Sequence, residues 1–288
     1  MSPFTINMKV LILLSILASA RSRATERCDG IIVNKINHEK IVLKSGINSP
    51  YQLAIDYDTG YLFFSYSAND DEVFKSAYIN LKTNNFGIIP GVSGGFANAV
   101  DSRKHNVYIG GRDGLYKFDF DSKSAKHIDG TDDNIWQLFY KDELYYSRYP
   151  DEAVYMYKEG RCERVPELQD TKAMLVALDN YKNFYFTNSS GMYMHKKSNG
   201  QRGFIGDFNA NGFATDINGN LFFSTPDGVY FINVEKKEVE RIAAIGNAYG
   251  VAIGGDGSII YASQNAIIRL NPTETFCIVD EFKSPFLI

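Results

Sequence analysis

The chain has 288 residues, a formal net charge of −4 and a hydrophobic content of 44%. Its slight acidity and its lack of clustered Lys and Arg exclude a nucleic-acid-binding protein, because phosphate backbones demand a basic surface. Nineteen Tyr and twenty Phe against a single Trp favour strands, since aromatic side chains pack well on a pleated sheet.

The first residues predict a secretory signal peptide. Lys9 precedes an apolar run over residues 10–17 that only Ser15 interrupts, and Ala18-Ser19-Ala20 follows as a small-x-small cleavage site. A run this short does not span a membrane, which takes about 20 apolar residues. We expect residues 1–20 to be removed, with cleavage as late as Ala24 as an alternative. Residues 25–288 are then expected to form one secreted, monomeric domain with no membrane anchor.

A module recurs six times along the rest of the chain. Its first element is a small residue, an apolar or β-branched residue and Asp in four copies, and it is degenerate in two. The copies are Ala54-Ile55-Asp56, Ala99-Val100-Asp101, Leu138-Phe139-Tyr140, Ala177-Leu178-Asp179, Ala214-Thr215-Asp216 and Ala252-Ile253-Gly254. Steps of 37 to 45 residues are typical of propeller blades.

An aromatic-rich second element follows each first element. Its copies cover residues 62–65, 107–110, 144–147, 184–187, 221–224 and 260–263. Short continuous apolar runs suit strands that are buried on both faces. Third elements such as residues 114–118 and 228–232 alternate, which predicts a more exposed place further out. Six such repeats predict an all-β fold, namely a six-bladed β-propeller closed by its N- and C-terminal segments. Two sandwich domains would leave the regular period unexplained.

Three cysteines in an oxidising compartment imply one disulfide and one free thiol. Cys28 and Cys277 lie near the two ends of the mature chain. Because a closed ring brings those ends together, we expect a Cys28–Cys277 disulfide and a free, buried Cys162. The strand around Ile41 precedes the first repeat and is expected to supply the outer strand of the sixth blade.

Two motifs resemble functional sites but fit turns better. Residues 91–95 match the GxSxG nucleophile elbow, yet a strand-like segment follows where the elbow needs a helix. Residues 216–220 resemble the start of a calcium loop but lack the downstream Glu. The four histidines have no metal-binding spacing. We therefore predict no catalytic residue, no metal and no cofactor.

Two further sets of polar residues have simple interpretations. The recurring Asp56, Asp101, Asp179 and Asp216 are expected to accept hydrogen bonds from turn amides in each blade, rather than to act as paired acids. Asn188-Ser189-Ser190 is a usable N-glycosylation sequon, whereas Pro50 blocks the one at Asn48. Asn188 is therefore a candidate glycan site, although its place at a strand end leaves occupancy open.

The entry to the first strand of each module gives the candidate ligand site. In a propeller these positions ring one mouth of the central channel, and here they hold five aromatic residues and one methionine, with amides beside them. The set is Tyr51, Phe96, Trp136, Met174, Phe213 and Tyr249, with the amides Gln52, Asn98 and Gln137. Such a ring suits a flat aromatic ligand with polar edges. The alternative is that these side chains simply pack between blades.

Four stretches of the mature chain follow a familiar pattern: Cys28-Asp29-Gly30-Ile31 and residues 49–56, 62–66 and 110–116. Together they resemble the ommochrome-binding proteins of lepidopteran haemolymph, and the resemblance covers essentially the whole mature chain. It implies a secreted haemolymph protein that carries a small-molecule pigment, an ommochrome such as xanthommatin or ommatin, and is not an enzyme. Ommochromes are flat phenoxazinones with polar edges, in agreement with the ring above. The resemblance assigns no binding residue.

Two other classes of function are open alternatives. A calcium-dependent lactonase or esterase on a related propeller needs Glu, Asp and Asn converging on the axis, whereas the ring positions here hold aromatics and amides. A protein-binding propeller is the other alternative, because fold alone does not give function. The pigment carrier is the leading hypothesis.

Overall fold

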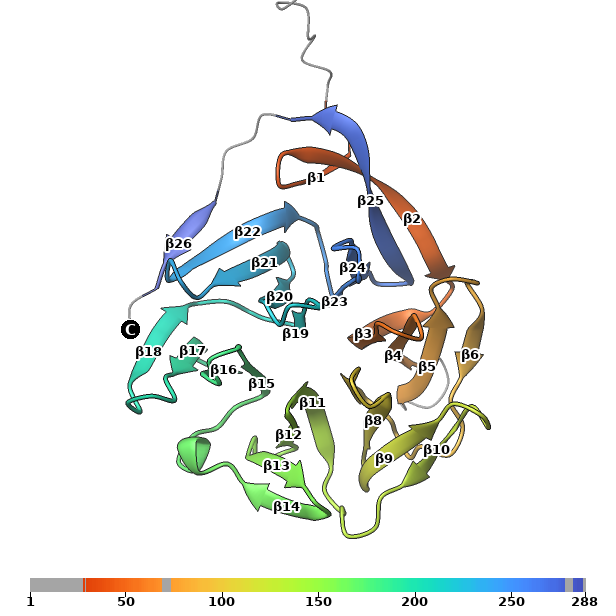
Figure 1. Cartoon of the computed structure of the whole chain (residues 1–288), viewed down its shortest axis with the longest axis vertical. Coiled ribbons are helices and arrows are strands. Elements are labelled where there is room, and N and C mark those ends of the chain that lie inside the picture. The colour runs from red at the N-terminus through yellow and green to blue at the C-terminus, as the bar shows by residue number, and fades with distance from the viewer. Residues whose placement is uncertain (1–27, 29, 69–73, 278–281, 287–288) are drawn as a thin grey trace, which may run out of the picture.

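The computed structural model describes residues 28, 30–68, 74–277 and 282–286. These residues form strands arranged as blades around a central axis (Figure 1). Each blade is antiparallel, and in the first five blades the strands follow one another outward from the axis as a meander. The fold is the all-β propeller that the repeat predicted, and the sole helical element among the described residues is the 3₁₀ turn η1 (Pro166–Leu168).

The first four blades are separate four-stranded sheets. Blade 1 contains β3 (Asn48–Asp56), β4 (Tyr61–Ser67), β5 (Phe74–Asn80) and β6 (Phe86–Ile88). Blade 2 contains β7 (Ala97–Asp101), β8 (Asn106–Gly111), β9 (Gly114–Asp119) and β10 (Ser124–His127). Blade 3 contains β11 (Ile135–Lys141), β12 (Glu143–Arg148), β13 (Val154–Lys158) and β14 (Arg161–Arg164). Blade 4 contains β15 (Leu175–Leu178), β16 (Phe184–Asn188), β17 (Gly191–His195) and β18 (Arg202–Gly206).

The last two blades are joined into one ten-stranded sheet. Blade 5 contains β19 (Gly212–Thr215), β20 (Leu221–Thr225), β21 (Gly228–Asn233) and β22 (Glu238–Ala244), with β26 (Lys283–Pro285) along its edge. Blade 6 contains β23 (Gly250–Ile253), β24 (Ile259–Ala262), β25 (Ala266–Phe276) and β2 (Ile36–Ser45). The short strand β1 (Ile31–Val33) pairs with both β2 and β22 and so links the two blades.

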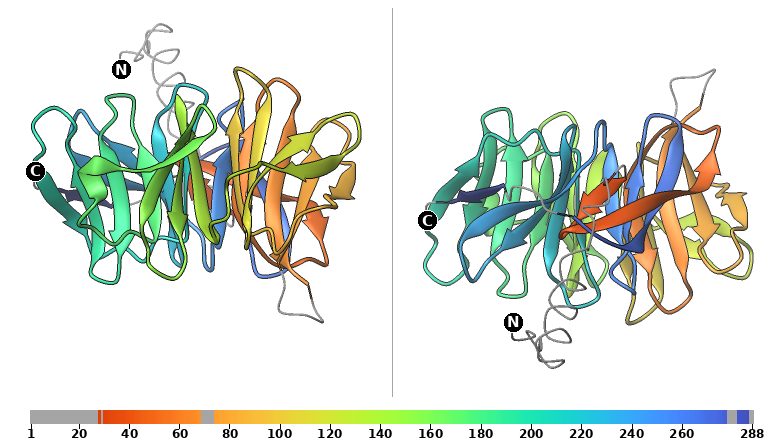
Figure 2. Two further views of the ribbon diagram at one scale, coloured as in Figure 1. Left: turned by 90° about the horizontal axis from the view of Figure 1, so that it is seen from below. Right: turned by 90° about the horizontal axis from the view of Figure 1, so that it is seen from above.

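The N-terminal strand closes the ring. β2 runs antiparallel to β25, from Ile36 opposite Phe276 to Ser45 opposite Ala266, and the edge-on views of Figure 2 show these orange and blue strands side by side. The disulfide Cys28–Cys277 fastens the far end of this pair, with the two Cα atoms 6.2 Å apart. Both the sixth-blade outer strand and the cysteine pairing are confirmed.

The core lies between blades rather than inside any one sheet. On β4, Leu62 and Phe64 pack toward blade 6, whereas Phe63 packs toward blade 2, and all three are fully buried. Because successive side chains of a strand point to opposite faces, a continuous apolar run fills the space on both sides of its blade. Each such side chain contributes roughly 1.5–3 kcal/mol by leaving water, so a blade depends on both of its neighbours.

The third strands are more buried than their alternating pattern predicted. On β9 only Lys117 is exposed, and on β21 no residue is exposed. Neighbouring blades cover both faces of these strands, and a fourth strand covers their outer edge. The expected exposure is found one strand further out, for example on β14. Cys162, on β14, is a free thiol as predicted but is partly rather than fully buried, and this burial raises the pKa of its thiol.

Removing the disulfide is predicted to destabilise the ring. Its cysteines are separated by 249 residues in sequence, so the bond restricts the unfolded chain over nearly its full length. The double variant Cys28→Ser/Cys277→Ser should lose about 2–5 kcal/mol of the free energy of unfolding, measured by urea titration with circular dichroism. Cys162→Ser is the control and should lose clearly less. An unchanged unfolding midpoint in the double variant would contradict the role given to this bond.

Candidate functional site

The central channel has two mouths of different chemistry. The inner strands β3, β7, β11, β15, β19 and β23 pack against one another around the ring. Residues that begin these strands meet at one end, as the contact between Tyr51 and Tyr249 shows. Residues that follow them meet at the other end, where the Tyr57 hydroxyl donates to the Thr215 carbonyl at 2.7 Å. We call these ends the strand-start mouth and the strand-end mouth.

Four of the predicted aromatics meet at the strand-start mouth, and we call Tyr51, Phe96, Trp136 and Tyr249 the aromatic cluster. Ring centroids are 5.4 Å apart for Tyr51 and Tyr249, 5.8 Å for Tyr51 and Phe96, and 4.7 Å for Phe96 and Trp136. Phe96 is buried, whereas the other three are partly exposed. The aromatic cluster therefore both packs between blades and presents ring surface to the outside.

Local irregularities in the strands aim two of these rings. The pairing of β3 with β4 shifts register on both sides of Tyr51, and Gln52 has φ of 51°. The pairing of β11 with β12 shifts between Ile135 and Gln137, which leaves Trp136 out of the ladder. Bulges of this kind re-aim a side chain and are frequent beside binding sites. In the aromatic cluster, burial and the neighbouring Tyr249 raise the pKa of Tyr51, so its hydroxyl stays protonated.

The three predicted amides are buried, and the side chains of Gln137 and Asn98 bind backbone groups. Gln137 donates to the carbonyls of Leu138 and Val176 at 2.8 and 3.0 Å and accepts the Val176 amide at 3.0 Å, which fixes blade 3 to blade 4. Asn98 donates to the Gln52 carbonyl at 3.2 Å, which fixes blade 2 to blade 1. Gln137 is thus committed to the fold, whereas the Asn98 Oδ1 is buried without a hydrogen-bond partner.

The remaining predicted residues are not members of the aromatic cluster. Met174 directly precedes β15 and is 38% exposed. Phe213, on β19, is 9% exposed and lines a channel cavity that also includes Asn98. Asn188 ends β16, and its Oδ1 accepts the Ser190 amide at 2.8 Å in the sequon itself. The structure therefore divides the predicted set between the two mouths.

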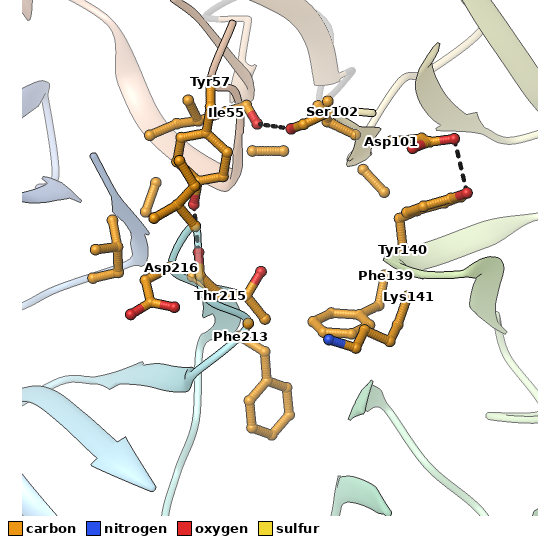
Figure 3. Close-up of a pocket in the computed structure, with 18 of the residues that line it drawn as sticks. Ile55, Tyr57, Asp101, Ser102, Phe139, Tyr140, Lys141, Phe213, Thr215 and Asp216 are labelled. Atoms are coloured by element: carbon orange, nitrogen blue, oxygen red, sulfur yellow. Dashed lines mark hydrogen bonds between the residues drawn. The ribbon is translucent and has the colours of Figure 1, made fainter. Parts of the chain in front are cut away.

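The channel also opens at the strand-end mouth, which the sequence analysis did not single out. A cavity of about 440 Å³ lies there, lined by side chains from the inner strands and the turns after them (Figure 3). Tyr57, Phe139, Tyr140, Lys141 and Phe213 are among its walls. A pattern could have found it: basic Lys141 ends the inner strand β11, and basic Arg103 lies two residues after the inner strand β7.

The recurring aspartates hold the turns, as predicted. Asp216 accepts the amides of Asn218 and Asn220 at 2.9 and 2.8 Å, and Asp179 accepts those of Tyr181 and Asn183 at 2.9 Å each. Asp101 accepts the Arg103 amide, and Asp56 accepts the Thr59 hydroxyl instead. The calcium-like segment 216–220 is therefore a turn that its own carboxylate closes.

The other motifs that resemble functional sites in the sequence also have structural explanations. Residues 91–95 form the loop between β6 and β7, so strand β7 follows Ser93 where a nucleophile elbow would need a helix. Within the described ranges, no group of three or more His, Cys, Asp or Glu side chains is placed to hold a metal ion. Among the residues that the structure describes, no helix is long and apolar enough to cross a membrane.

Known proteins share both the sequence and the fold. No family model matches the chain. The ommochrome-binding protein of Manduca sexta is 37% identical over 274 residues, which are 93% of this chain and 99% of that protein. A gluconolactonase from Xanthomonas campestris has a TM-score of 0.68 at 12% identity, over 88% of this chain and 99% of its own. The WD40 propeller domain of Doa1 has a TM-score of 0.58 at 13% identity, over 85% and 98%.

The two structural likenesses are too distant in sequence to show more than a shared propeller. The likeness to the Manduca sexta protein is of another kind, because it extends over nearly the whole of both chains. The chain belongs to the ommochrome-binding protein family.

Proposed function

We propose that this protein binds an ommochrome and carries it without changing it chemically. The name of its Manduca sexta relative supports this proposal. The observation that carries it is the aromatic cluster at the strand-start mouth, where bulges flank Tyr51 and leave Trp136 without a partner in the ladder. Bulges interrupt the ladder, and here they give the mouth a surface of partly exposed rings.

A phenoxazinone ring system fits this surface. Three partly exposed rings, those of Tyr51, Trp136 and Tyr249, offer stacking or edge contacts to a flat ligand. Each contact of this kind contributes about 0.5–1.5 kcal/mol beyond the area that it buries. Met174, exposed on the next blade, offers a flexible apolar contact at the ligand's side. The Tyr51 hydroxyl is protonated and supplies a polar group for the ligand's edge.

The protein is proposed to act outside the cell, in haemolymph, as a monomer. The disulfide between Cys28 and Cys277 supports this location, because such bonds persist in oxidising compartments. The predicted signal peptide, residues 1–20, lies outside the described residues. Asn188 is proposed as its glycan site, since the sequon ends β16 with Ser189 and Ser190 exposed.

Pigment binding is predicted to quench the single tryptophan. Xanthommatin titrated into the purified mature protein should give saturable quenching of Trp136 fluorescence, after correction for absorption by the pigment, because the proposed site includes that ring. Equilibrium dialysis under the same conditions should give the same dissociation constant. If dialysis shows no saturable uptake, the carrier proposal is wrong.

Single substitutions are predicted to separate the aromatic cluster from general packing. Tyr51→Leu and Tyr249→Leu should each raise the dissociation constant about 2- to 10-fold, which is the loss of one ring contact. Phe204→Leu is the matched control, because Phe204 is 47% exposed on the outer strand of blade 4. Dialysis measures the affinity and thermal unfolding checks the fold. Equal affinities in all three variants would place the pigment elsewhere.

A further inference from the structure

The cavity at the strand-end mouth has aromatic walls whose hydroxyl groups are already occupied. Phe139 and Phe213 are buried in its wall, at 6% and 9% exposure, and offer a ligand aromatic surface without a polar group. The Tyr57 hydroxyl donates to the Thr215 carbonyl at 2.7 Å, and the Tyr140 hydroxyl donates to Asp101 Oδ2 at 2.8 Å. The volume of about 440 Å³ is within the range of small-molecule sites. The walls therefore suit a flat aromatic body.

At the rim of this cavity stands a lysine whose ammonium binds an amide oxygen rather than a carboxylate. Lys141 ends β11, and its side chain points into the opening beside Phe139 (Figure 3). Its ammonium donates to Asn180 Oδ1, and among the described residues no ion pair includes it. Burial lowers the pKa of this ammonium. Partial burial of a cation that has one hydrogen-bond acceptor costs free energy, unless a further acceptor binds its remaining donors.

The nearby carboxylates are committed elsewhere. Asp142 is paired with Arg103 at 2.7 Å and with Lys182 at 3.2 Å. Asp101 holds the Tyr140 hydroxyl, and Asp216 holds its own turn. Asp58, which also lines the cavity, has its Oδ2 3.6 Å from His105 Nε2. Asp179, whose charge acts on Lys141, accepts four hydrogen bonds within its own blade. None of these carboxylates forms an ion pair with Lys141 among the described residues, so the ammonium donors that do not bind Asn180 can serve another molecule.

The lysine is held in place by turns of blades 4 and 5. Asn180, which accepts its hydrogen bond, donates in turn to the Asn218 carbonyl at 2.9 Å. Gly219 has φ of +78°, and a Cβ there would come within 2.8 Å of the Lys141 Nζ and 2.3 Å of the Asn180 Oδ1. Glycine alone leaves room for this arrangement, so the cation is positioned rather than free to swing.

A second unsatisfied group lies deeper in the cavity. Asn98 is 4% exposed and lines it. Its Nδ2 donates to the Gln52 carbonyl, which fixes the orientation of the amide, and its Oδ1 has no hydrogen-bond partner. Asn98 lies one residue before the repeat element of blade 2 and Lys141 one residue after that of blade 3. Counted in equivalent positions of the repeat, Asn98 and Lys141 are therefore four residues apart, which is about 13 Å along the strand direction.

We propose that the strand-end mouth is a binding site for a planar two-ring aromatic carboxylate with an O–H or N–H donor at its far end. The carboxylate binds Lys141, the rings lie between Phe139 and Phe213, and the donor reaches Asn98 Oδ1. A bicyclic acid with a hydrogen bond at each end spans a distance of this size. The site is at the opposite end of the channel from the aromatic cluster, so it does not depend on the proposed pigment binding there.

Three probe molecules test this site by isothermal titration calorimetry on the mature protein. The probe 6-hydroxy-2-naphthoate has its carboxylate and hydroxyl at opposite ends and should bind saturably. Its carboxamide lacks the charge and should bind at least 10-fold more weakly, whereas 2-naphthoate lacks only the donor and should bind about 3- to 10-fold more weakly. Failure of the wild-type protein to bind the hydroxy acid at millimolar concentration would overturn the proposal.

Variants of Lys141 test whether the carboxylate of the probe binds to this side chain. Lys141→Met should weaken binding of the hydroxy acid at least 10-fold and leave the carboxamide unchanged, and Lys141→Arg should recover part of the loss. Lys126→Met is the control, because Lys126 is exposed on the outer strand of blade 2. Thermal unfolding verifies that each variant folds. Equal affinity for the hydroxy acid in wild type and Lys141→Met would also refute the site. Pigment titration is a separate readout, so either proposal can fail alone.

Discussion

The pairing of β2 with β25 is the interaction on which the rest of the molecule depends. No blade buries its own side chains, because each one is a single sheet with apolar residues on both faces. The six spaces between blades are all filled only when the ring is complete. The antiparallel pair at the sixth blade and the disulfide beside it supply that completion, and the channel exists as a defined cavity because of them.

The channel presents contrasting chemistry at its two ends because different parts of the repeat reach them. Positions near the start of the inner strands carry no turn-forming role, so bulky rings such as Tyr51 and Trp136 can occupy them where the regular ladder is interrupted. Residues that follow those strands must close tight turns, which requires aspartate and glycine at fixed places. The other positions at the strand-end mouth, such as Lys141, do not have to form the turns, and their side chains determine the charge of that mouth.

The six-fold period, the buried second strands and the cysteine pairing could all be predicted from the sequence, because each follows from one requirement, a closed ring of like units. The bulges at Tyr51 and Trp136 could not, since no residue pattern distinguishes them from continuous strand. The cavity at the strand-end mouth was missed for another reason. Its walls come from turns and strands of several blades, and only the closed ring brings Lys141 beside Asn180 and Asn98 near Phe213. The burial of β9 was likewise decided by neighbouring blades.

The place of β2 in blade 6 also bears on how the chain matures. β2 leaves the ribosome before any blade is complete, yet its partner β25 is among the last strands to be synthesised. Until β25 is synthesised, β2 is thus an open edge, the kind of segment that pairs with foreign chains. Its charges Glu39, Lys40 and Lys44 are all exposed or partly exposed in the finished protein, and on the nascent chain they act as gatekeepers against such pairing.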